Sequence, residues 1–239
     1  MKNSNQRFFT EHLIKSIKCK VVLLFFLMLF ISAQQALAVT CHCFKERSFK
    51  PAQPASADPY ILATARNSLL AAASGIEKGK VIRQRMTGAT ETDLWLSSYL
   101  STRVDILADQ LLDERDKVSS WTAALDAVDL DTGMLGTTFK EARKAGDADG
   151  MARTLADPVL GRVFNAGEPT LTRLRDKGAN IAESALSLYL AGLMNRPPEN
   201  ILAEVGDGKQ TWGSLFNSLG IRIDTIGDLI AEAVKGEIP

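Results

Sequence analysis

The apolar residues of this chain recur every three or four positions through most of its length, which is the spacing of one helix face. The first such stretch, Tyr60 to Ser74, follows Asp58-Pro59, where aspartate suits the N-cap and proline the first helical position, and it stops at Gly75. No stretch alternates apolar and polar residues as a half-buried strand would. The pattern predicts an all-α fold, a compact multi-helix array of roughly eight to ten helices.

The longest regular pattern predicts one continuous helix from Thr92 or Asp93 to Val118. Its stripe is formed by Leu96, Leu100, Arg103, Leu107 and Leu111. The segment from Gly75 to Gly88 favours a further short helix, and Ser119-Ser120 provides a cap for another that carries Trp121 and Leu125.

Proline and glycine divide the second half of the chain into short helices. Asp157-Pro158 and Glu168-Pro169 each predict a helix start, as Asp58-Pro59 does. The strongly apolar stretch from Ala179 to Met194 predicts the central buried helix. Thr211 and Asp224 are expected to cap the last two helices. The predicted core includes Leu100, Leu107, Leu186, Leu190 and Trp212.

The first 38 residues have the three parts of a signal peptide. A lead with five basic residues and one acid precedes the apolar run Val21 to Ile31, and Ala36-Leu37-Ala38 places small residues where a signal peptidase needs them. The apolar run is too short for a spanning helix, which needs roughly 20 residues. We expect cleavage before Val39, no stable membrane span afterwards, and a periplasmic or secreted protein.

Residues 39–57 have no periodicity and contain Pro51 and Pro54, which predicts an extended, flexible tether before a helical domain at 58–239. The irregular stretch 129–136 is the best place for a subdomain boundary. Removing residues 1–38 leaves 23 Lys and Arg against 27 Asp and Glu, a net charge near −4. This mild acidity gives no electrostatic reason to bind nucleic acid.

Both cysteines and the only histidine that remain after cleavage lie together in Cys41-His42-Cys43. In an extended chain Cys41 and Cys43 point to the same side, so the pair could bind copper or zinc as thiolates. A closed zinc site needs about four ligands, so carboxylates, methionines or a partner chain would have to complete it. The alternatives are a strained Cys41–Cys43 disulfide with redox activity, or a passive pair.

No other motif points to chemistry. A Ser-His-Asp or Cys-His catalytic set cannot be built on the helical domain, because His42 is the sole histidine of the mature chain. Gly206-Asp207-Gly208 and the stretch 146–150 lack the ligands of a calcium loop and are interpreted as turns. Asp105, Asp109 and Asp113 lie four residues apart and are interpreted as a solvated helix face.

Two stretches of the second half, Gly206 to Ile221 and Tyr189 to Pro197, resemble helical segments of uncharacterised secreted bacterial proteins. The resemblance implies a helical fold and brings no activity with it. The sequence therefore predicts an exported, non-catalytic binding or assembly module, with a Cys-His-Cys tail that contacts a metal ion or the thiol of an unknown protein partner. The alternative is a periplasmic thiol-redox or copper-handling protein that uses Cys41 and Cys43.

Overall fold

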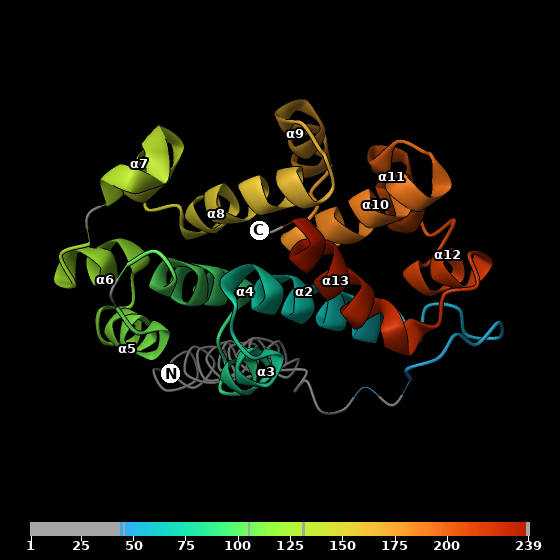
Figure 1. Cartoon of the computed structure of the whole chain (residues 1–239), viewed down its shortest axis with the longest axis horizontal. Helices are drawn as coiled ribbons and strands as arrows, with labels where there is room; N and C mark the ends of the chain where they lie inside the picture. The colour runs from blue at the N-terminus through green and yellow to red at the C-terminus, as the bar shows by residue number, and fades with distance from the viewer. Residues whose placement is uncertain (1–43, 45, 105, 131, 238–239) are drawn as a thin grey trace, which may run out of the picture. The chain divides into compact units, whose positions relative to one another are not determined.

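The structure is a computed structural model that describes residue 44 and residues 46–104, 106–130 and 132–237. All of these belong to the unit Thr40–Pro239. The described residues form helices and turns and contain no strand, so the all-α prediction is confirmed (Figure 1). This part of the chain holds twelve α-helices, slightly more than the eight to ten expected.

The α-helices are α2 (Asp58–Ser74), α3 (Lys78–Met86), α4 (Glu91–Leu94), α5 (Ala108–Val118), α6 (Trp121–Ala127), α7 (Gly136–Ala145), α8 (Ala148–Val163), α9 (Glu168–Asp176), α10 (Ile181–Met194), α11 (Pro198–Gly206), α12 (Trp212–Ser218) and α13 (Ile226–Glu237). A π-helix, η1 (Trp95–Tyr99), continues α4, and two 3₁₀ turns, η2 (Thr132–Leu135) and η3 (Ile223–Thr225), precede α7 and α13.

Helix α2 lies at the centre and contacts α13, α10, α3 and η1 (Figure 1). Ile61, Ala65 and Leu69 on it are fully buried, and Gly75 ends it with a left-handed backbone at φ 67°. Helix α10, predicted as the central buried helix, packs against α2 with Leu186 and Leu190 fully buried. These two helices therefore form the middle of one shared core.

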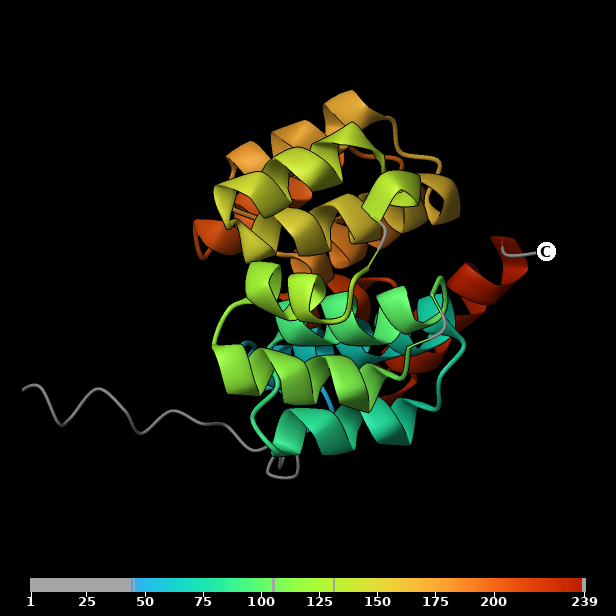
Figure 2. The same ribbon diagram turned by 90° about the vertical axis from the view of Figure 1, so that its left-hand side faces the viewer.

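The helices of the unit are arranged in two layers (Figure 2). Helices α7 to α11 lie on one side, and α3 to α6 lie on the other. The layers meet where α10 contacts α2 and where α8 contacts η1 and α4. The expected boundary region at 129–136 connects α6 in one layer to α7 in the other.

The prediction of one uninterrupted helix to Val118 is wrong, because a non-helical stretch separates η1 from α5. The hydroxyl groups of Ser101 and Thr102 donate to the carbonyls of Ser98 and Tyr99, at 2.7 Å each, and compete with the helical backbone pattern. Leu107, predicted in the core, is the residue before α5 and is 75% exposed.

A second correction concerns Asp157-Pro158, which was predicted to start a helix. Helix α8 already begins at Ala148, where the side chain of Asp147 accepts the backbone N–H of Gly150. Pro158 lies inside α8 and cannot donate to the carbonyl of Thr154. The helix continues because Leu155, Val159 and Leu160 are buried in the core.

The described part of the segment before α2 is held against the helical unit. The ring of Phe44 lies edge-on to Tyr60 with centroids 6.2 Å apart, and the Arg47 guanidinium lies 5.5 Å from the centroid of Tyr60. Phe49 packs against the core, and the Pro54 carbonyl accepts the hydroxyl of Thr211 at 3.1 Å. The extended course expected here is replaced by turns from residue 51 to 57.

Within the described residues no helix combines the length and the apolar character needed to cross a membrane.

Candidate functional site

Cys41, His42 and Cys43 lie outside the described residues, so the metal and disulfide interpretations stay predictions. Within the described ranges, no group of three or more His, Cys, Asp or Glu side chains is placed to hold a metal ion. The described residue that follows Cys43 is Phe44, which contacts Tyr60 at the start of α2.

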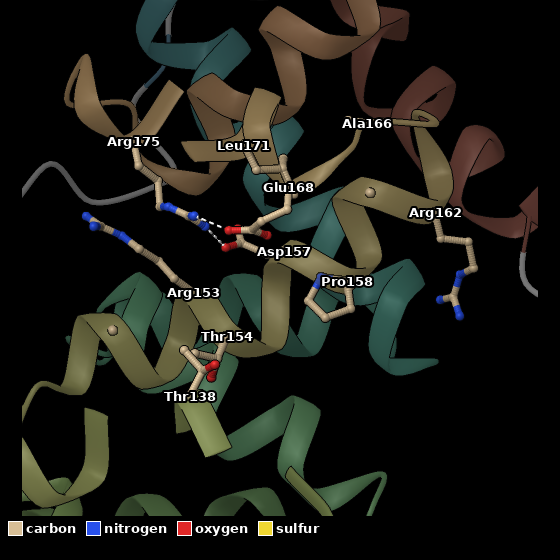
Figure 3. A pocket seen from close by; sticks show the side chains of 12 residues that line it. Thr138, Arg153, Thr154, Asp157, Pro158, Arg162, Ala166, Glu168, Leu171 and Arg175 are labelled. Carbon is tan, nitrogen blue, oxygen red and sulfur yellow. Dashed lines mark hydrogen bonds and ion pairs between the residues drawn. The ribbon is translucent and has the colours of Figure 1, made fainter. Parts of the chain in front are cut away.

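A cleft of about 620 Å³ lies between α8 and α9, and Thr138 of α7 also lines it (Figure 3). Ligand sites in proteins commonly have volumes of this order. The lining residues are Thr138, Gly150, Arg153, Thr154, Asp157, Pro158, Gly161, Arg162, Ala166, Glu168, Leu171 and Arg175. Apolar surface from Pro158, Ala166 and Leu171 therefore lies beside charged groups from both helices.

A tight turn between α8 and α9 brings the two charged faces together. The backbone N–H of Ala166 donates to the carbonyl of Gly161 at 2.9 Å, and Asn165 has a left-handed backbone at φ 50°. A Cβ at Gly161 would lie 3.0 Å from the Ala166 carbonyl oxygen, so glycine permits this approach. Leu171 and Leu174 are buried and fix α9 against its neighbours.

Arg175 on α9 is the central polar group of the cleft, because it binds two carboxylates from different helices (Figure 3). Its Nη1 pairs with Asp157 of α8, and its Nη2 lies 2.5 Å from Glu168 Oε1 at the start of α9. Nη2 also donates to the hydroxyl of Thr172 at 2.8 Å, and that hydroxyl donates to the same Glu168 oxygen at 3.2 Å.

The two carboxylates differ in their exposure to solvent. The side chain of Asp157 is 16% exposed, whereas that of Glu168 is 68% exposed. Burial raises the pKa of Asp157 above its ordinary value, although the charge of Arg175 opposes the shift. The pKa of Arg175 is raised despite its partial burial, because the hydrogen bond that it donates to Glu168 and the charge of Asp157 favour the cation. Asp157 is thus the fixed partner of Arg175, and Glu168 is the solvated one.

Arg153 adds a second cation to this end of the cleft. It lies one turn before Asp157 on α8, extends toward the Arg175 side, and lowers the pKa of Asp157 by its charge (Figure 3). Its guanidinium forms no ion pair with a carboxylate of the described residues. Arg162 lies beyond Pro158, and its guanidinium points away from Arg175 (Figure 3).

The lining residues suit binding better than covalent catalysis. The hydroxyl groups on the wall belong to Thr138 and Thr154, and the latter donates to the Met151 carbonyl at 2.7 Å. Neither hydroxyl is hydrogen-bonded to a lining carboxylate that could act as its base, since Asp157 and Glu168 both pair with Arg175. What the cleft does present is a forked guanidinium, a second arginine and an apolar floor, which together can hold the charged end of a small ligand.

Sequence reasoning missed this site because it placed a helix start at Asp157. Once α8 is continued through Pro158, Arg153 and Asp157 fall four residues apart on one face. Glu168, Thr172 and Arg175 likewise share a face of α9. Charged residues on one face of each helix are the signal in the sequence, but the meeting of the two faces depends on the turn between them.

The acidic motifs of the sequence serve as structural contacts where the structure describes them. Asp109 accepts from Lys80 at 3.0 Å and from Gln84 at 2.7 Å, which lowers its pKa, while Asp105 lies outside the described residues. Asp207 pairs with Lys209 at 2.7 Å. Asp149 accepts a hydrogen bond from Thr92, which joins α8 to α4.

A cluster of partly buried charged groups lies among α2, α3 and α4. Burial raises the pKa of Glu91, the charges of Arg66 and Arg85 oppose that shift, and Glu183 and Asp149 reinforce it. Glu91 Oε1 and two nitrogen atoms of Arg85 are buried without a hydrogen-bond partner among the described residues. None of Glu91, Arg66 and Arg85 lines the cleft between α8 and α9.

Comparison of the chain with family models, with curated proteins and with solved structures finds no match.

Proposed function

We propose that this chain is an exported, non-catalytic binding module whose helical unit holds a small ligand in the cleft between α8 and α9. The observation that supports it is the Arg175 fork, which the largely buried carboxylate of Asp157 orients inside a hollow of about 620 Å³. An arginine held by such a carboxylate loses little further freedom when it binds a ligand, so its binding site is preorganised. An exported location and cleavage before Val39 belong to the same proposal, and N-terminal sequencing of the exported protein tests them.

Blocking the cleft tests the proposal. Thr138 is exposed on α7 and lines the cleft, so Thr138→Trp places a large ring over its mouth without disturbing the core. Lys140→Trp, also exposed on α7 but outside the lining, is the matched control. Benzoate, inorganic phosphate, glucose and benzylamine serve as probes of four chemical classes, with binding followed by calorimetry.

We expect at least one probe to bind the wild type, with at least a fivefold loss in Thr138→Trp and no loss in Lys140→Trp. Ala166→Trp, on the opposite wall, repeats the test if Thr138→Trp lowers the melting temperature. If no probe binds, or if both cleft variants bind like the wild type, the proposal is wrong.

We propose that the Cys-His-Cys tail is a second, separate contact, for a copper or zinc ion or for a partner's thiol. Phe44 and Arg47 both contact Tyr60, so the described residues that follow the tail are held against the start of α2. The alternative, thiol-redox or copper-handling activity of Cys41 and Cys43, uses the same residues. The net negative charge of the mature chain supports a protein or small-molecule partner over nucleic acid.

Free-thiol counting followed by copper titration separates these interpretations. Tight copper binding by the reduced protein, lost in Cys41→Ser with Cys43→Ser, supports a metal contact. A Cys41–Cys43 disulfide that forms and reduces reversibly supports redox activity. The absence of both shows that the pair is passive and removes the tail from the proposed function.

A further inference from the structure

The exposed carboxylate of Glu168 occupies the position on Arg175 that the oxyanion of a ligand would take. It accepts from Arg175 Nη2 at 2.5 Å and from the Thr172 hydroxyl at 3.2 Å, so two donors converge on one oxygen, Oε1. A carboxylate or phosphate oxygen of a ligand can accept both bonds with the same geometry. The donors are therefore already arranged for an oxyanion, and a side chain of the protein fills their place.

The contact of Glu168 with Arg175 is exchangeable, whereas that of Asp157 is not. Glu168 is 68% exposed, and an ion pair between exposed groups contributes on the order of 1 kcal/mol or less. Asp157 is largely buried, so its carboxylate would lose its charge partner in a poorly solvated site if Arg175 turned away. A ligand that enters the cleft would thus displace Glu168 and leave the Asp157–Arg175 pair in place.

Arg153 makes the exchange favourable for an anion. Arg175 is neutralised by Asp157, and Glu168 contributes a further negative charge, while Arg153 supplies a cation with no ion-pair partner in the described part of the chain. When Glu168 is displaced into solvent, the anion meets Nη2 of Arg175, the Thr172 hydroxyl and the field of Arg153. Pro158 and Ala166 offer apolar surface to the body of the same ligand.

We propose that the cleft recognises the carboxylate or phosphate of a small ligand on Arg175, Thr172 and Arg153, with Glu168 as a built-in competitor that the ligand displaces. This inference rests on the proposed function, since it names the ligand class of the same cleft. Carboxylate and phosphate share the chemistry that the donors recognise.

The test measures the affinity of benzoate and of inorganic phosphate, in separate titrations at constant ionic strength in Tris chloride. Glu168→Gln removes the competing charge but keeps the size of the side chain. We expect it to bind the preferred oxyanion about two- to fivefold more tightly than the wild type, which is the range for an exposed ion pair. The probe whose affinity increases in Glu168→Gln shows whether the cleft prefers a carboxylate or a phosphate.

Arg153→Gln and Lys140→Gln form a matched pair, since each removes one positive charge from an exposed position, Arg153 inside the cleft and Lys140 on α7 outside its lining. We expect Arg153→Gln to weaken the same probe about fivefold and Lys140→Gln to change it less than twofold. The melting temperatures of all variants check that the fold is kept.

The inference is wrong if Glu168→Gln leaves the affinity unchanged or weakens it, or if Lys140→Gln has the same effect as Arg153→Gln. Binding of glucose or benzylamine in the cleft without binding of either oxyanion would also overturn it, while the proposed function would stand. Failure of every probe would instead contradict the proposed function itself.

Discussion

The carboxylate of Asp58, in the first turn of α2, accepts the backbone N–H of Gly213 at 2.8 Å and that of Trp212 at 3.1 Å, which begin α12. These residues are separated by 155 and 154 positions in the sequence. Asp58 was expected to cap α2, but its side chain caps α12 instead, and Ala57 precedes α2 without a side-chain bond. The contact joins the beginning of the helical unit to its last third.

Replacement of Asp58 by alanine leaves two N–H groups at the start of α12 without acceptors. We expect Asp58→Ala to lower the free energy of unfolding by about 1–3 kcal/mol, measured by urea denaturation. Asp224→Ala is the control, because Asp224 pairs with the exposed Arg222 and its loss should cost less than about 1 kcal/mol. Equal effects of the two substitutions would contradict the role of Asp58.

Leu186 and Leu107 were both predicted in the core, but only Leu186 is buried there. We expect Leu186→Ala to lower the free energy of unfolding by about 2–5 kcal/mol, because it leaves a cavity in the core beside α10. Leu107→Ala should change the free energy of unfolding by no more than about 0.5 kcal/mol, since its side chain is largely in water. A large loss of unfolding free energy in Leu107→Ala, in the same denaturation experiment, would argue against the non-helical stretch between η1 and α5.

Gly227 allows α13 to approach α2 closely. A Cβ at this position would lie 2.4 Å from Thr64 Oγ1 and 2.8 Å from Ser68 Oγ, both on buried residues of α2. We expect Gly227→Ala to destabilise the protein by about 1–3 kcal/mol, because the two helices must separate. Gly236→Ala, near the end of the same helix with nothing within 4 Å of its Cβ, should leave stability unchanged or raise it by up to about 1 kcal/mol. Thermal unfolding of both variants tests this contrast.

Glu91 makes the stability of the protein depend on pH. Burial raises its pKa in the folded state above the ordinary value of 4.5, so the folded state binds this proton more tightly than the unfolded state. Its contribution to stability is complete below pH 4.5 and is lost as the pH rises through the folded-state pKa.

Glu91→Gln removes this titration. The difference in unfolding free energy, wild type minus variant, should therefore decrease as the pH rises from about 4 to about 8. Urea titrations of both proteins across that range measure the difference. A difference that is constant, or that increases with pH, would show that Glu91 is not held in a desolvated site.

Much of the fold follows from local patterns in the sequence. Gly75 ends α2 with a left-handed backbone, and Thr211 caps α12, as their positions predict. These signals act within one turn of helix, so they do not depend on the rest of the protein. The pattern of Asp58-Pro59 and Asp157-Pro158 is locally the same, yet the first begins a helix and the second lies inside one.

The difference between the two Asp-Pro pairs arises from tertiary contacts. Asp147 has already started α8, and burial of Leu155 and Val159 outweighs the hydrogen bond lost at Pro158. The cleft depends on contacts of the same kind, since Asp157 and Arg175 meet only through the turn between α8 and α9. Local helix patterns therefore place these residues on helices but do not show that the two charged faces meet.

The most direct test of the binding cleft is to map bound benzoate or phosphate by amide NMR on the full mature chain. The account predicts that the largest shifts occur at Arg153, Thr154 and Ala166, and on α9 from Glu168 to Arg175. It also predicts that Thr138→Trp abolishes these shifts. Shifts confined to the hollow beside Asp58 and Leu62, or no saturable shift on α8 and α9, would contradict the assignment of the cleft as the ligand site.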